Sequence, residues 1–146
     1  MTALLLFFHI LLFVFSFAFT AGISILLGKL AAGKDAKAIQ AAFRAAQPLS
    51  ITGGIGWILT ALSGGALAGA SGLDMTAPWL LMSYGAFAVL ILAGFLMHAP
   101  WHAKVIAAAP GPELDAALAA PSHRIASALS ALAVLSLLFL MTVRPG

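Results

Sequence analysis

Four long apolar runs alternate with short polar segments along this chain. The runs cover about residues 3–28, 49–73, 78–97 and 125–143. A helix needs about 20 apolar residues to cross the hydrocarbon core of a bilayer, so each run is long enough. Lipid leaves open backbone groups without partners, and the runs are too long for barrel strands. The pattern predicts an all-α membrane protein: a four-transmembrane-helix bundle forming a single domain over residues 1–146.

The composition agrees with a chain that lies mostly in lipid. Hydrophobic residues make up 63% of it and charged residues only 8%, whereas a soluble domain carries about 25% charged residues. The chain has no cysteine, which excludes disulfides and thiolate metal sites. Its basic residues lie between apolar runs, a pattern that favours contact with the lipid bilayer and not with nucleic acid.

The lysines and arginines are distributed unevenly between the two sides of the predicted bundle. Six of the seven follow the first or the third run: Lys29, Lys34, Lys37, Arg44, Lys104 and Arg124. Only Arg144 lies on the opposite side. Because loops rich in lysine and arginine stay in the cytoplasm, we predict that both basic loops are cytoplasmic and both termini periplasmic. The predicted location is the bacterial inner (cytoplasmic) membrane, crossed several times.

Short amphipathic helices are expected in the cytoplasmic loops. In residues 35–47, Ile39 and Phe43 share one helical face, and Pro48 suits the first turn of the second span. Pro100 disfavours a helical conformation at the residue before it, so a new turn is expected to start there. We expect these segments to lie along the lipid headgroups.

The second span is rich in glycine, alanine and serine. Gly65 and Gly69 are four residues apart, a spacing that lets a neighbouring helix come close. Ser127 and Ala131 on the fourth span have the same spacing. The pattern indicates tight packing within the bundle, or alternatively space for a flat cofactor or a contact between copies.

His9 is the only histidine inside a predicted span, and no acidic or basic residue accompanies it there. That absence argues against a proton relay or a transporter of charged substrates. Helical geometry places Ser16 and Thr20 on the same face as His9, and this face should point into the bundle. A structural His9 would bond to Ser83 or to a backbone carbonyl. A functional His9 would be an axial haem ligand, with Met82 or an exogenous ligand on the other side of the iron.

Three further histidines gather at the predicted cytoplasmic edge. His98 and His102 are four residues apart, and His123 precedes the fourth span. This spacing is compatible with two metal ligands on one helical face. They are either interfacial histidines or a copper, zinc or haem site.

The order of these features resembles a group of small bacterial four-helix membrane proteins. The first span begins Phe8-His9-Ile10-Leu11, and a later one begins Pro78-Trp79-Leu80-Leu81 and ends at His98. The group includes predicted membrane proteins of unknown function, the copper-resistance D family and the four-helix protoporphyrinogen oxidase. The resemblance to the oxidase implies that His9 matches its haem-carrying histidine and Trp79 its tryptophan.

The chain departs from the oxidase pattern at two places. Leu81 and Ser83 stand where that pattern has a histidine and a lysine. Residues 26–29 read Leu-Leu-Gly-Lys where it has an aromatic residue and an arginine. These departures argue against oxidase activity.

Three functions remain open from the sequence. The preferred one is non-enzymatic: an accessory or structural subunit of a membrane complex, with other membrane subunits or further copies of itself as partners. The second is a redox or haem-handling protein that binds haem b through His9. The third is copper handling by the cytoplasmic-edge histidines.

Overall fold

The computed structural model describes residues 2–33 and 35–144, and nearly all of them are helical. In chain order the helices are α1 (Thr2–Phe17), η1 (Ala18–Gly22), α2 (Ile23–Ala31), α3 (Ala36–Ala70), α4 (Pro78–Ala93), η2 (Gly94–His98), α5 (Ala99–Ala107), α6 (Pro112–Leu118) and α7 (Pro121–Val143). Within the described residues, four helical stretches are long and apolar enough to cross a membrane. The prediction of an all-α protein with four membrane-crossing helices is therefore confirmed, and this is the architecture of a multi-pass membrane protein.

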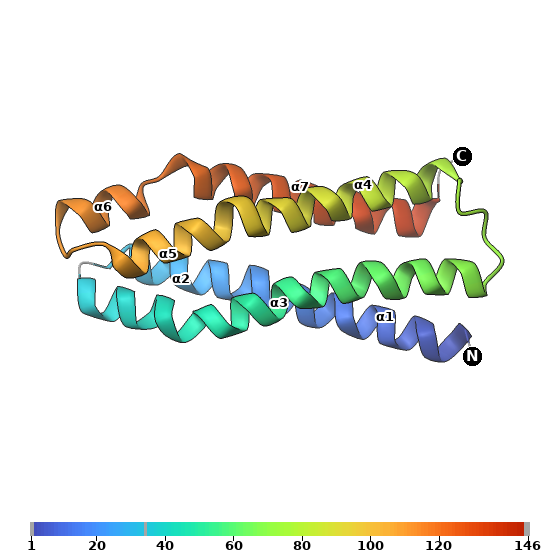
Figure 1. The fold of residues 1–146 in the computed structure, drawn as a ribbon, viewed down its shortest axis with the longest axis horizontal. Coiled ribbons are helices and arrows are strands. Elements are labelled where there is room, and N and C mark those ends of the chain that lie inside the picture. The colour runs from blue at the N-terminus through green and yellow to red at the C-terminus, as the bar shows by residue number, and fades with distance from the viewer. Residues whose placement is uncertain (1, 34, 145–146) are drawn as a thin grey trace.

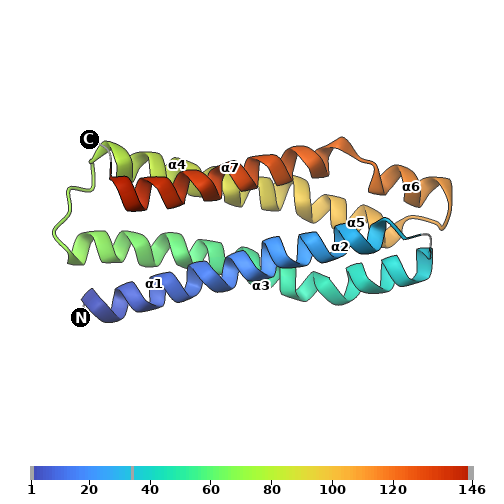
Figure 2. The same cartoon turned by 180° about the vertical axis from the view of Figure 1, so that it is seen from behind.

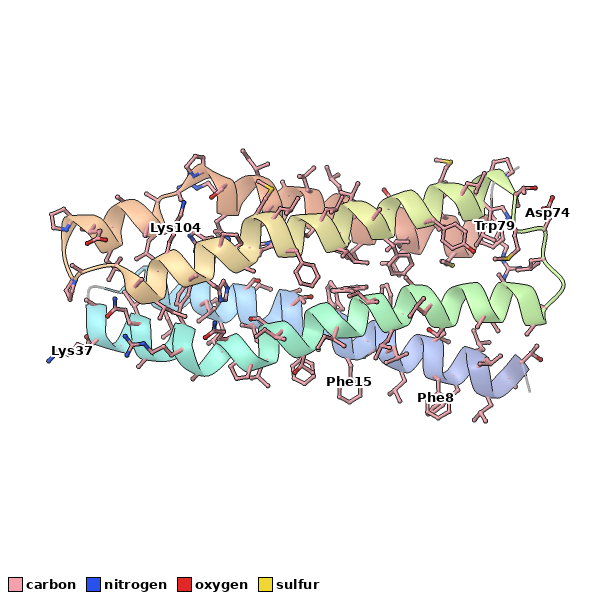
Figure 3. All side chains as sticks on the ribbon, viewed as in Figure 1. Phe8, Phe15, Lys37, Asp74, Trp79 and Lys104 are labelled. Carbon is pink, nitrogen blue, oxygen red and sulfur yellow. The ribbon has the colours of Figure 1, made fainter. Side chains whose placement is uncertain are left out.

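The helices form two antiparallel hairpins that lie on each other (Figure 1). One hairpin pairs α1 and α2 with α3, and the other pairs α4 and α5 with α6 and α7. The start of α1 and the end of α7 lie at the same end of the bundle, beside the loop that joins the hairpins. The reverse view shows the same arrangement (Figure 2). We call this the terminal end, and the opposite end, which carries Lys37 and Lys104 (Figure 3), the basic end.

Two packed clusters hold the hairpins together. The mid-bundle cluster consists of Trp57, Phe87, Leu90, Ala133, Val134 and Leu137. The basic-end cluster consists of Leu27, Ile39, Phe43, Ala46, Trp101, Val105, Ala108 and Leu114. Both draw on each hairpin, so the bundle is filled from its middle to its basic end.

The segment predicted as a separate amphipathic helix is instead the beginning of α3. Helix α3 starts at Ala36, where the Asp35 carboxylate accepts hydrogen bonds from the N–H groups of Lys37 and Ala38, and it continues through Pro48. Its 35 residues extend about 52 Å, against about 30 Å of hydrocarbon. Pro48 therefore lies inside a helix, and the prediction that it occupies a first helical turn is wrong. Transmembrane helices tolerate an interior proline because neighbouring groups satisfy the freed backbone.

The predicted break at Pro100 is also wrong, for a different reason. Ala99 is helical (φ −63°, ψ −46°), and its N–H donates to the carbonyl of Gly94, five residues back. This π-helical turn η2 lengthens the hydrogen-bond ladder immediately before the proline, which has no N–H to offer. The third membrane-crossing stretch therefore runs without a break from Pro78 to Ala107.

At the basic end, where headgroup-lying helices were expected, α5 packs against α3 and α6 packs against α5. The Gln40 side-chain amide donates to the carbonyl of Ala108 (2.6 Å). The Trp101 indole N–H donates to the carbonyl of Ala117 (2.9 Å). These bonds fasten both short helices, so the basic end is a packed cap on the bundle.

Candidate functional site

A cavity of about 690 Å³ separates the two hairpins at the terminal end. Helices α1, α3, α4 and α7 all contribute to its wall. The apolar lining residues are Ala3, Leu6, Ile10, Phe13, Leu67, Ala68, Leu73, Leu80, Leu137, Leu138 and Met141. Sites for small molecules and cofactors are mostly apolar and measure about 300–1,000 Å³. The cavity therefore has the size and lining of a ligand site.

His9 lines this cavity, and one of its ring nitrogens is already satisfied. Nδ1 lies 3.0 Å from the carbonyl oxygen of Thr60 and 3.0 Å from the hydroxyl of Ser63. A carbonyl only accepts, so Nδ1 carries the proton and donates to Thr60. Nε2 is then the unprotonated nitrogen of the neutral ring, with a lone pair available to a ligand. Metal-binding histidines are usually held in this way, by a hydrogen bond from the other ring nitrogen.

A row of small residues on α3 lets α1 approach closely. A Cβ added to Gly64 would lie 2.9 Å from Cε1 of His9, and one on Gly53 would lie 2.8 Å from Cγ2 of Thr20. Between them, a Cβ on Gly56 would overlap the side chain of Ser16. Later residues of α1 meet earlier residues of α3, because the two helices are antiparallel. The face of α1 that carries His9, Ser16 and Thr20 therefore lies along the glycine row of α3, which consists of Gly53, Gly56 and Gly64.

The glycines predicted to make the close contact are not the ones that do. A Cβ on Gly69 would meet nothing within 4 Å, and one on Gly65 would meet only the Tyr84 hydroxyl, at 3.9 Å. On the fourth span Ser127 is half-buried and Ala131 is exposed. The tight helix contact within this chain therefore uses another face of α3, and Ala131 has no part in the core.

The partners predicted for His9 on the third span also require correction. The Ser83 hydroxyl is buried but donates to the carbonyl of Trp79 on its own helix (2.8 Å). Of the two predicted structural partners, the backbone carbonyl is the one present. Met82 is 60% exposed on the outer face of α4, so it does not reach the cavity. Among the described residues, the methionine that lines the cavity is Met141 on α7.

The terminal rim of the cavity carries a cation over an aromatic ring. The guanidinium carbon of Arg144 lies 5.6 Å from the centre of the Trp79 ring, and both residues line the cavity. Trp79 lies in the first turn of α4, near the loop that contains Asp74 (Figure 3). Arg144 has a left-handed backbone (φ 47°), which costs a non-glycine residue about 1–2 kcal/mol. The turn at the end of α7 thus holds the guanidinium at the rim.

The three cytoplasmic-edge histidines lie near one another at the basic end, within an aromatic cluster. The His123 ring stacks on Trp101 (3.8 Å between centres, 11° between planes), and its centre lies 5.5 Å from that of His98. His102 is buried between Phe43 and Trp101. Among the described residues, no group of three or more His, Cys, Asp or Glu side chains is placed to hold a metal ion. The geometry gives no support to the predicted metal site, and these rings serve the packing of the cap.

The sequence interpretation missed four residues of the site: Thr60, Ser63, Gly64 and Arg144. The missed signal was the spacing of Gly53, Gly56, Thr60 and Gly64, which repeats every three or four residues and so forms one helical face. Its antiparallel partner is the face of His9, Ser16 and Thr20. Pairing the two faces would have placed His9 opposite Gly64.

Comparison with known proteins gives no relative from which a function could be transferred. No family model matches the chain, and neither a curated protein nor a solved structure is similar to it.

Proposed function

We propose that this chain is a haem-b-binding protein of the bacterial inner membrane, with Nε2 of His9 as an axial ligand. The observation that carries the proposal is the state of His9: Nδ1 is bonded to the Thr60 carbonyl, and the ring borders a large apolar cavity. A haem-binding imidazole needs one nitrogen free for the iron. An orienting hydrogen bond on the other nitrogen fixes the tautomer that supplies it.

The residues around His9 fit a flat apolar ring with acidic substituents. The absence of a side chain at Gly64 lets the imidazole itself lie against α3, since a Cβ there would collide with the ring. Leu6, Ile10 and Leu137 supply an apolar wall, which limits access of water. Arg144 at the rim offers a cation to a carboxylate. Haem b, when bound, supplies one-electron chemistry or is itself the cargo.

Replacing His9 tests this proposal directly. Purified wild-type protein, titrated with hemin in neutral detergent, should develop a Soret band at one equivalent. His9→Ala should abolish that band, because no other histidine lines the cavity among the described residues. The measurement is the absorption spectrum of oxidised and dithionite-reduced protein.

His98→Ala and His123→Ala are the matched controls, because both rings lie in the basic-end cap. Both variants should keep the band. A band that survives in His9→Ala, or a wild-type protein that binds no hemin, would contradict the proposal. In the second case a stability loss in His9→Ala would identify the histidine as structural.

The proposed orientation places the basic end in the cytoplasm. Five of the six basic residues predicted to be cytoplasmic lie in the described part of the chain, and Lys34 lies outside it. Single cysteines introduced near Lys37 or Lys104 should be protected from a membrane-impermeant maleimide in intact spheroplasts. A cysteine at Thr76, in the terminal loop, should be labelled. The reverse labelling pattern would overturn the charge-based orientation.

A second candidate function rests on the outer face of α1. Phe8 and Phe15 point away from the rest of the bundle (Figure 3) and are about half exposed. Such a face contacts lipid or another membrane protein, which is how an accessory subunit or a homo-oligomer would use it. Native mass measurement in detergent tests this: a monomer without co-purifying protein would contradict it.

A further inference from the structure

The lining of the cavity is polarised along the bundle axis. Its polar residues other than His9 lie at the start of α1, directly after α3, and at or directly after the end of α7, all at the terminal end: Thr2, Ser71, Thr142 and Arg144. The residues deeper in the bundle, such as Phe13 and Leu137, are apolar. A molecule that fits this cavity has a polar end at the rim and an apolar body.

The rim is also selective for the sign of charge. Of the described residues that line the cavity, Arg144 is the only charged one. Asp74, the nearest acidic residue along the chain, is not part of the lining. Its carboxylate accepts hydrogen bonds from the hydroxyl and the N–H of Thr76, and these bonds hold the pKa of Asp74 below its usual range. Asp74 is therefore charged at neutral pH, and its hydrogen bonds are made within its own turn.

The contact with Trp79 leaves the guanidinium able to bind an anion. A cation–π contact is an attraction between the guanidinium charge and the face of the indole ring, and it needs no hydrogen bond. The N–H donors lie in the guanidinium plane, where they match the oxygens of a carboxylate or a phosphate. Trp79 can thus hold the group at the rim without occupying its donors.

We propose that the cavity selects an anionic amphiphile, with its carboxylate or phosphate on Arg144 and its apolar body extending inward to His9. This inference rests on the proposed function to the extent that haem b, with two propionates, is such a molecule. A single-chain lipid with an acidic head has the same chemistry. The two sources are distinguished by the probes used.

Esterified probes isolate the acidic group from the apolar body. The purified protein is titrated with hemin and with hemin dimethyl ester, followed by the Soret band. A second titration uses a fluorescent polyene fatty acid and its methyl ester, followed by fluorescence. Wild-type protein should bind at least one acid about tenfold more tightly than its ester, the usual scale of a hydrogen bond to a charged group. Arg144→Gln should remove that preference, and Arg144→Lys should keep part of it.

Arg124→Gln is the matched control, because it removes an exposed arginine at the basic end, far from the rim. It should leave every titration unchanged. Equal binding of acid and ester by the wild type, a preference that survives in Arg144→Gln, or no binding of any probe would overturn the inference. Haem bound without preference for the acid, with no preference for the fatty acid either, would overturn the inference and leave the proposed haem binding intact. An acid preference with the fatty acid alone would support it and defeat haem as the ligand.

Discussion

Gly56→Leu should lower the thermal stability of the purified protein more than a leucine at any exposed glycine of α3. Even a Cβ at residue 56 would overlap the side chain of Ser16, which is 1% exposed between the two helices. A leucine there forces α1 away from α3 along the whole glycine row. Overpacking of this kind costs about 1–3 kcal/mol, occasionally more. Thermal unfolding in detergent measures it.

Gly69→Leu is the control, on the same helix but with nothing within 4 Å of its Cβ. The sequence alone would have chosen Gly69 as the damaging position. Leucine in place of an exposed helical glycine gains roughly 0.8–1 kcal/mol of helix propensity, so Gly69→Leu should be neutral or stabilising. Equal loss of stability in both variants would mean that the Gly56 contact does not hold α1 in place. A damaging Gly69→Leu would instead indicate a contact between copies.

The membrane-crossing helices could be predicted because hydropathy fixes their number and approximate position. Their rotation could not, because nearly every face of α3 carries a small residue. Gly54, Gly65 and Gly69 are as small as Gly56 and Gly64, and composition does not say which of them faces α1. The glycines that face α1 can be identified only by pairing the helical face of His9 on α1 with the helical face of Gly64 on α3, in antiparallel order.

The two prolines show where local rules fail in a long membrane helix. Pro48 and Pro100 read as helix boundaries because proline has no N–H and disfavours a helical residue before it. In the structure, a π-helical turn precedes Pro100 and α3 continues through Pro48. The basic-end cluster packs residues before Pro48 and after Pro100, and the mid-bundle cluster packs Trp57 and Leu90 on the other side of each proline. Burial of these apolar side chains outweighs the local preference.

Of the candidate site, the sequence predicts only His9; the cavity and the role of Arg144 could not be predicted from it. His9 could be identified because it is the only histidine in the predicted spans, where no acidic or basic residue accompanies it. The cavity beside it depends on the distance between two hairpins, which no single helix encodes. Arg144 lies beyond the last apolar run, so only the left-handed turn that ends α7 shows that its side chain reaches the rim.

Phe43→Ala should destabilise the protein by about 3–5 kcal/mol, the usual cost of removing a buried aromatic ring. The Phe43 side chain is 0% exposed. Its ring centre lies 5.2 Å from that of Trp101 and 5.1 Å from that of His102. Truncation would leave a void where α3 meets α5, and both helices would lose contacts. Denaturant unfolding in mild detergent, followed by tryptophan fluorescence, reports this loss.

Phe8→Ala is the matched control, since Phe8 is 48% exposed and points away from the bundle (Figure 3). Its removal should change the free energy of unfolding far less than Phe43→Ala does. The comparison separates two descriptions of the basic end. If residues 36–47 lay along the headgroups as a separate amphipathic helix, Phe43 would contact lipid and its loss would resemble that of Phe8. A large difference between the two variants means that this segment is the capped beginning of α3, and equal effects would contradict the packed cap.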